Sequence, residues 1–132
     1  MAFLEDEVPV GAVIVKDDKI IAKAHNKCEK NGDPTCHAEL IAIKKALKKL
    51  NTSRLKGCQL YVTLEPCPMC AGAIIHARID EVIFGAFDLK GGAVSSKTDL
   101  FNRGFNHIPT VYEGILEKEC AEILSDFFKT KR

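Results

Sequence analysis

The stretch QLYVTLEPCPMCAGAIIHAR, residues 59–78, decides the fold that the sequence predicts. Its first part, Gln59 to Leu64, is apolar and β-branched, which is typical of a buried strand. Pro66-Cys67-Pro68 then marks the start of a helix that runs to about Arg78, because proline is tolerated in a first helical turn. A buried strand followed at once by a helix indicates the α/β class.

Similar patterns continue on both sides of this stretch. The other predicted elements are strands Val8 to Val15 and Ile20 to Ala24 around an Asp17-Asp18 turn, a helix from Asp33-Pro34 to Leu50, a strand from Glu81 to Ala86, a short helical piece near Asp99 after the Gly91-Gly92 loop, a strand from Thr110 to Glu113, and an amphipathic helix from Leu116 to Lys129. This order predicts a three-layer α/β/α sandwich whose helices cover both faces of a central five-stranded mixed sheet.

Composition indicates one cytoplasmic domain over residues 1–132, with reduced cysteines. Nineteen basic and eighteen acidic side chains give a net charge of +1, so no cationic field favours DNA, and any RNA contact must be local, as at Lys129, Lys131 and Arg132. No apolar stretch approaches the roughly 18 residues of a membrane span, and the acidic first residues do not resemble a secretion signal. We therefore expect no membrane partner.

Three side chains supply the ligands of a metal centre. Cys67 and Cys70 are three residues apart at a helix start, so both sulfur atoms project from one face, and His37 lies near the start of another predicted helix. Two sulfur atoms and one nitrogen select zinc over calcium or magnesium. Three protein ligands leave a fourth position open for water, as in catalytic zinc sites. We expect one zinc ion per subunit.

Glu39 lies two residues after His37, where a proton carrier is useful. Two thiolates cancel the charge of Zn(II), so this ion should acidify water less than a three-histidine site does, and a base must help. Glu39 can take a proton from water and return protons to the substrate and its leaving group. The chemistry predicts hydrolytic deamination, and the H-x-E and P-C-x-x-C pair is the known signature of zinc-dependent nucleobase deaminases.

Other cysteines and histidines are weaker candidates. Cys36 adjoins His37, but adjacent helical residues diverge by about 100° and seldom reach one metal, so we expect Cys36 to pack as a small apolar side chain. His25, His76 and His107 have no ligand-spaced partner and are predicted to be surface or hydrogen-bonded histidines. A non-catalytic zinc-stabilised RNA-binding module is one alternative, although such a module has no use for a carboxylate beside an open metal site.

Longer stretches carry a more specific signal than the metal ligands. They are EVPVGA (residues 7–12), Asn26 before DPTCHAE (residues 33–39), LYVTLEPCPMCAGAIIHAR (residues 60–78), FGAFDLK (residues 84–90), Asn106-His107 and DFF (residues 126–128). Through these stretches, nearly end to end, the chain resembles the tRNA-specific adenosine deaminases of the cytidine deaminase-like superfamily. The resemblance implies hydrolytic conversion of the wobble adenosine of a tRNA anticodon to inosine, with loss of ammonia.

The resemblance also implies roles for residues around the substrate. Asn26 is expected to read the purine edge, and Val10 and Leu64 to line the pocket. The Ala38 amide and the Glu65 carbonyl are expected to hold water or the leaving group. These types suit the task, because an unstacked base is recognised by hydrogen bonds to its edge and by apolar walls.

Five further residues match positions at which the family meets the anticodon stem-loop: Asp88, Lys90, Phe127, Phe128 and Lys129. Because neighbours on a helix face different ways, we expect one ring of the Phe pair in the core and the other in solvent or against RNA. The family forms homodimers, which implies a homodimer here. Its members begin with a fuller amino-terminal helix, whereas only residues 2–7 precede the first predicted strand, so this helix is expected to be shortened.

A deaminase of a free purine base or nucleoside, such as guanine deaminase, is the strongest alternative. It would retain the metal ligands but close its pocket over a small molecule, so the zinc chemistry does not separate the two functions. The continuation Ala71-Gly72-Ala73-Ile74 and the aromatic and basic carboxyl end of the chain favour RNA through the resemblance.

Overall fold

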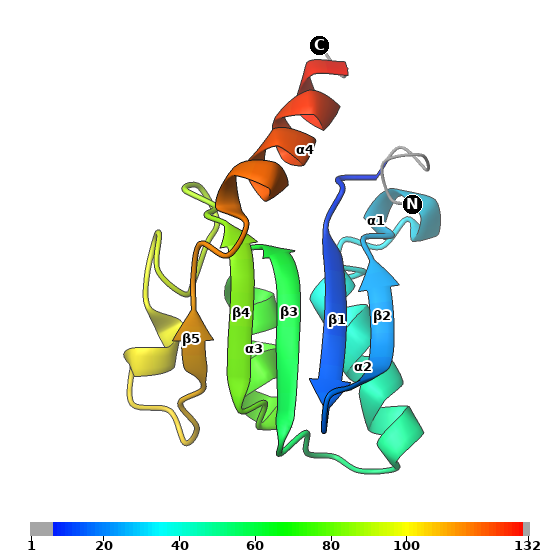
Figure 1. Cartoon of the computed structure of the whole chain (residues 1–132), viewed down its shortest axis with the longest axis vertical. Helices are drawn as coiled ribbons and strands as arrows, with labels where there is room; N and C mark the ends of the chain where they lie inside the picture. The colour runs from blue at the N-terminus through cyan, green and yellow to red at the C-terminus, as the bar shows by residue number, and fades with distance from the viewer. Residues whose placement is uncertain (1–6, 131–132) are drawn as a thin grey trace.

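Five strands form the central layer of the computed structural model, which describes residues 7–130. They are β1 (Gly11–Lys16), β2 (Lys19–His25), β3 (Cys58–Leu64), β4 (Glu81–Ala86) and β5 (Thr110–Tyr112), arranged in the order β2-β1-β3-β4-β5 (Figure 1). β1 pairs antiparallel with β2 and β3, whereas β4 pairs parallel with β3 and β5. The predicted mixed sheet is confirmed. The expectations about residues 2–6, Lys131 and Arg132 lie outside the described residues.

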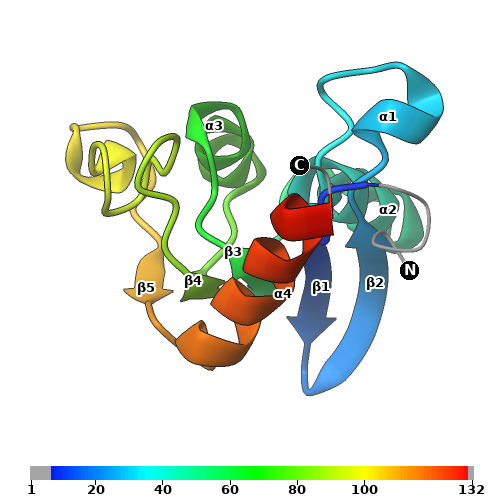
Figure 2. The same cartoon turned by 90° about the horizontal axis from the view of Figure 1, so that it is seen from above.

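Helices lie on both faces of this sheet. Figure 2 shows α2 (Ala38–Leu50) and α3 (Pro68–Ala77) on one side and α4 (Glu117–Thr130) on the other. The remaining helical pieces are the short α1 (Cys28–Asn31) and the 3-10 turn η2 (Leu100–Asn102). The predicted three-layer α/β/α sandwich is confirmed. Within residues 7–130, no helix is long and apolar enough to cross a bilayer.

The hairpin between β1 and β2 has the turn that its sequence predicts. Asp17 and Asp18 both adopt positive φ, at 51° and 62°, which matches the twist of two antiparallel strands and is tolerated by aspartate. The first strand begins later than expected, at Gly11. The Val10 N–H donates to the Val8 carbonyl at 2.8 Å, and this tight turn uses backbone groups that a ladder would need.

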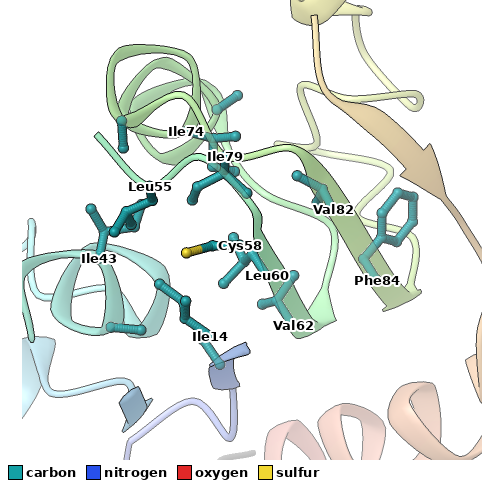
Figure 3. Packing of buried hydrophobic residues seen from close by; sticks show 14 of the residues in the cluster. Ile14, Ile43, Leu55, Cys58, Leu60, Val62, Ile74, Ile79, Val82 and Phe84 are labelled. Carbon is teal, nitrogen blue, oxygen red and sulfur yellow. The ribbon is translucent and has the colours of Figure 1, made fainter. Parts of the chain in front are cut away.

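The core lies between the sheet and the helices α2 and α3. Ile14, Leu60 and Val82 of three neighbouring strands point toward Ile43 of α2 and Ile74 of α3 (Figure 3), and all five are buried. Fully burying one such side chain contributes about 1.5–3 kcal/mol before entropic costs. This packing fixes both helices on the sheet, and it therefore also fixes where each helix begins.

The expected start of α2 at Asp33 is wrong. The Asp33 carboxylate accepts hydrogen bonds from the Thr35 N–H at 2.8 Å and the Thr35 hydroxyl at 2.7 Å. This local turn satisfies Asp33 before a helix can form. The helix begins at Ala38, and His37 is the residue at its N-cap position.

A short helix that the sequence did not predict, α1, depends on a distant carboxylate. The side chain of Glu7 is buried and accepts hydrogen bonds from the N–H groups of Glu29 at 3.0 Å and Lys30 at 2.6 Å. These are first-turn amides, which have no partner within the helix. Glu7 therefore caps α1 from 22 residues away, a separation at which local pattern carries no signal.

Helix α4 packs closely against β4 at Gly85. A Cβ at this glycine would overlap Cys120 Sγ and would lie 3.0 Å from the Ile115 carbonyl oxygen, a tight contact with backbone. Beside α4, the same face of the sheet has an apolar groove of about 730 Å³ that runs along β1, β3 and β4. In the described part of the chain, α4 thus covers this face only in part.

Substitution of Gly85 by alanine is expected to destabilise the fold by ~1–3 kcal/mol, the usual cost of overpacking. Gly72→Ala is the matched control, because a Cβ at Gly72 would meet no atom within 4 Å. As an exchange inside helix α3, it should raise stability by up to about 1 kcal/mol. Urea unfolding monitored by circular dichroism would measure both, and equal midpoints for the two variants would contradict the close approach of α4.

Candidate metal centre and active site

The predicted metal ligands come together at one edge of the sheet. Cys67 occupies the N-cap position of α3 and Cys70 its first turn, while His37 occupies the N-cap position of α2. Both helices begin at the edge where the parallel strands β3 and β4 end (Figure 1). The carboxyl ends of parallel strands are the usual place for a functional site in α/β folds.

The geometry of the three ligand atoms fits a tetrahedral metal ion. His37 Nδ1 lies 3.6 Å from Cys67 Sγ and 3.5 Å from Cys70 Sγ, and the three atoms all lie within 4.8 Å of one another. Zinc bonds of about 2.3 Å to sulfur and about 2.1 Å to nitrogen, at tetrahedral angles, separate these atoms by about 3.6 Å. The cluster is therefore compatible with zinc. Its three side chains account for three of the four positions of a tetrahedral ion.

The pKa values of the two thiol groups are shifted in opposite directions. The Cys70 thiol donates to Cys67, and this bond, opposed by burial and aided by His37, lowers the pKa of Cys67 to about 4. The same hydrogen bond, together with burial, raises the pKa of Cys70. The hydrogen bond to Cys67 raises the pKa of His37. The helix amino end also favours a thiolate, so binding of a metal would displace the proton that the sulfur atoms share.

Glu39 lies beside the cluster, in the first turn of α2, and only 4% of its surface is exposed. Burial raises the pKa of its carboxyl group to about 7, because the charged form loses hydration. Nearby His37 opposes this shift. A carboxyl group with a pKa near neutrality can both accept and return a proton, which is what general acid–base chemistry requires.

Asn26 is held near the cluster by two backbone hydrogen bonds. Its own N–H donates to the Val10 carbonyl at 3.0 Å, and the N–H of Lys27 donates at 3.0 Å to the carbonyl of Cys36, the residue before His37. Asn26 is 9% exposed, and the residues from 7 to 130 offer its side-chain amide no hydrogen-bond partner. This amide is therefore available to a ligand.

The predicted pocket residues surround the same edge. Val10 directly precedes β1 and Leu64 ends β3, and these two strands pair antiparallel, so both residues lie at the same edge of the sheet. Val10 is buried and Leu64 half-buried. Ala38 is the first residue of α2, where helix amides lack internal partners.

Comparison with known proteins supports a deaminase. A family model described as MafB19-like deaminase matches residues 1–132. The tRNA-specific adenosine deaminase of Aquifex aeolicus (strain VF5) is 50% identical over 131 residues, which are 99% of this chain and 87% of that protein. The chain belongs to the tRNA-specific adenosine deaminase family. A structure solved in work on A-to-I editing by tRNA:A34 deaminases at the wobble position is 49% identical, with a TM-score of 0.90, covering 92% of this chain and 89% of that one.

The fold is also shared outside this family. A guanine deaminase from Nitrosomonas europaea has a TM-score of 0.82 at 23% identity, over 95% of this chain and 75% of that chain. At this level of identity the likeness shows the fold alone.

Other cysteines and histidines of the described residues lie outside the three-ligand group. Cys36 lies outside the three-ligand group, and its sulfur accepts the Asn31 side-chain amide at 3.5 Å. His107 Nε2 lies 2.6 Å from the Ile79 carbonyl oxygen, so it is a hydrogen-bonded histidine, as predicted. His76 is exposed.

The residues expected to contact RNA lie on two elements. Asp88 and the exposed Lys90 follow β4, whereas Phe127, Phe128 and Lys129 lie near the end of α4. Phe127 is 5% exposed and Phe128 49%, so the prediction of one buried and one exposed ring is confirmed. In this deaminase family member, α4 extends beyond the edge that carries the metal ligands (Figure 1).

The side chain of Glu65 is the feature that sequence reasoning missed. Its carbonyl group was expected to serve the substrate, but its carboxylate is buried, with 2% exposure, and accepts hydrogen bonds from the loop between residues 88 and 96. Burial alone would raise the pKa of Glu65, yet bonds from Ser96, Ser95 and Asp88 outweigh it and hold the pKa below its usual value. A glutamate before Pro66 resembles surface charge in sequence, so only the three-dimensional contacts reveal it.

Loss of one sulfur ligand is expected to abolish metal binding. Cys70→Ala leaves two ligands in the cluster, which should remove bound metal after gel filtration, measured by elemental analysis. Cys36→Ala is the matched control, because Cys36 adjoins His37 but its sulfur lies outside the three-ligand group. Equal metal content in the two variants would show that the cluster is not the binding site.

Proposed function

We propose that this chain is a zinc-dependent hydrolase that converts the wobble adenosine of a tRNA anticodon loop to inosine. The observation that carries the proposal is the buried Glu39 carboxyl group beside a cluster that, among residues 7–130, has three ligand side chains and no fourth. Its position in a chain that is 50% identical to a tRNA-specific adenosine deaminase supports tRNA as the substrate.

His37, Cys67 and Cys70 would hold the zinc ion, one per subunit. When bound there, zinc would act as a Lewis acid that lowers the pKa of a water molecule, which makes this water a better nucleophile. A thiolate is already favoured at Cys67, at the amino end of α3, where the hydrogen bond from Cys70 lowers its pKa.

Glu39 moves the protons of the reaction. It takes one proton from the attacking water, whose oxygen bonds to the ring carbon that carries the amine, and delivers this proton to the neighbouring ring nitrogen. It then transfers the second proton to the amine, the carbon–nitrogen bond breaks, and ammonia leaves. Burial of Glu39 keeps its carboxyl group ready for both directions of transfer.

Asn26, Val10, Leu64, Ala38 and Glu65 would hold the base. The unpaired amide of Asn26 can bond the purine edge, and the side chains of Val10 and Leu64 provide apolar walls. The Ala38 N–H and the Glu65 carbonyl would hold water or the leaving amine. A base reaches such a pocket only after leaving its stack, which is easiest in a single-stranded loop.

The proposal includes the surroundings of the site. Asp88, Lys90, Phe127, Phe128 and Lys129 would contact the anticodon stem-loop, whose phosphates require only local positive charge. Residues 1–132 would form one zinc-dependent deaminase domain, acting as a cytoplasmic homodimer.

An anticodon stem-loop with a wobble adenosine is the substrate that tests the proposal. We expect conversion of that adenosine to inosine, detected by mass spectrometry of the digested RNA, and little turnover of free guanine, adenosine or cytidine. A stem-loop with guanosine at the wobble position is the control. Turnover of guanine alone would instead establish the free-base alternative.

Glu39→Gln is expected to keep the metal and the fold but to lower kcat by about 10²–10⁴, the usual contribution of a general acid–base group. Glutamine preserves the size of the side chain and removes its ability to carry a proton. Metal content and the thermal unfolding midpoint would be measured beside the rate. Unchanged deamination by this variant would refute the role of Glu39 and, with it, the proposed mechanism.

A further inference from the structure

The buried carboxylate of Glu65 is bonded on both oxygens by one loop. Oε2 accepts the N–H groups of Val94 at 3.2 Å, Ser95 at 2.7 Å and Ser96 at 2.8 Å. Oε1 accepts the Asp88 N–H at 3.1 Å and the Ser96 hydroxyl. Successive backbone N–H groups that converge in this way form an anion-binding nest. Here the chain supplies the anion itself, and the bonded donors are uncharged.

The loop approaches this carboxylate closely at Gly92. A Cβ at Gly92 would lie 2.3–2.5 Å from the carboxyl carbon and oxygens of Glu65, so only glycine fits here. The Gly92 N–H also donates to the Asp88 carbonyl at 2.8 Å, which closes the turn between the two. A buried charge without hydrogen bonds is costly, so the loop and the carboxylate hold each other in one arrangement.

Glu65 also joins this loop to the metal ligands. It directly precedes Pro66-Cys67, and its own N–H donates to the Ala86 carbonyl at 2.8 Å, at the end of β4. The Pro66 carbonyl accepts the Ala93 N–H at 2.9 Å. The strand end that leads to Cys67 and the loop after β4 are therefore tied together at three points, through the Glu65 side chain and two backbone bonds.

Asp88 lies at the start of this loop. The orientation of its side chain depends on the contact between the loop and Glu65. Asp88 Oδ1 accepts the N–H groups of Lys90 at 3.1 Å and Gly91 at 3.0 Å. Its second oxygen, Oδ2, has no hydrogen-bond partner among residues 7–130. The Asp88 backbone N–H is bonded to Glu65, so the direction of the free oxygen follows from the position of the Glu65 carboxylate.

We propose that the Glu65 carboxylate is a positioning residue that orients Asp88 and the loop of residues 88–96 for binding the RNA substrate. The proposal rests on the proposed function, because it assumes that Asp88 meets the anticodon loop. Glu65 acts through Asp88 and does not touch the reacting base with its side chain. Loss of its charge is therefore expected to affect binding of the RNA more than binding of the metal.

Glu65→Gln tests this role with little change in volume. If the glutamine oxygen keeps the three N–H groups of Val94, Ser95 and Ser96, its NH₂ group faces the Asp88 N–H, and two donors then oppose each other. The Ser96 hydroxyl can rotate and accept, but the Asp88 amide cannot. The variant should therefore lose the hydrogen bond to the Asp88 N–H and keep those to Val94, Ser95 and Ser96.

Glu65→Gln retains the backbone carbonyl assigned to the substrate, so we expect the variant to keep one metal ion per chain and to lose more in binding of the stem-loop than in the single-turnover rate at saturation. Its Kd for the stem-loop should rise about tenfold or more, because a small misplacement of a binding group removes much of its effect. Gly92→Ala should also raise the Kd more than it lowers the single-turnover rate, because the added Cβ displaces the same carboxylate. Elemental analysis, fluorescence anisotropy and single-turnover kinetics measure the three quantities.

A double-mutant cycle with Asp88→Ala decides whether Glu65 acts through Asp88. The Kd of the double variant should be no higher than that of the weaker-binding single variant, because both changes remove one interaction. Additive effects, loss of metal or a fall in the saturated rate alone would overturn the proposal. A wild-type chain that fails on the stem-loop would count against the proposed function, whereas a working wild type with an unaffected Glu65→Gln variant would refute the role of Glu65 alone.

Discussion

The starts of two helices must meet at one point for this molecule to hold a metal. His37 and Cys67 are each the residue at an N-cap position, so a shift of either helix along its axis would separate the ligand atoms. Apolar packing of α2 and α3 on the same face of the sheet prevents such a shift, and it leaves Nδ1 and the two sulfur atoms at tetrahedral separations. The active-site chemistry thus depends on the hydrophobic core.

The same packing sets the behaviour of the acid–base group. Glu39 lies in the first turn of α2, where the core begins, so its carboxyl group loses water and its pKa rises toward neutrality. Glu65, also buried, has the opposite outcome, because five hydrogen bonds stabilise its charge. Two glutamates at one edge of a sheet therefore differ in kind: the pKa of Glu39 lies near neutrality, as proton exchange requires, whereas Glu65 keeps a charge that is bonded by one loop.

Local sequence pattern was sufficient for the strands, the hairpin turn and the ligand-bearing start of α3, since each is determined by neighbouring residues. It failed at Asp33, whose side chain bonds Thr35 in a turn, so that α2 begins at Ala38. Nor could it find the capping of α1 by Glu7 or the contacts of Glu65, which join residues 22 to 31 positions apart. Such contacts exist only after the chain has folded.

The metal cluster and its glutamate do not by themselves choose a substrate. A guanine deaminase shares this fold at 23% identity, and the fold likewise does not choose a substrate. In this chain the loop after β4 begins at the edge of the sheet where His37, Cys67 and Cys70 meet, and α4 extends beyond that edge (Figure 1). Because Glu65 joins that loop to the strand end before Cys67, a change in substrate preference that moved the loop would have to preserve this carboxylate or replace all of its hydrogen bonds together.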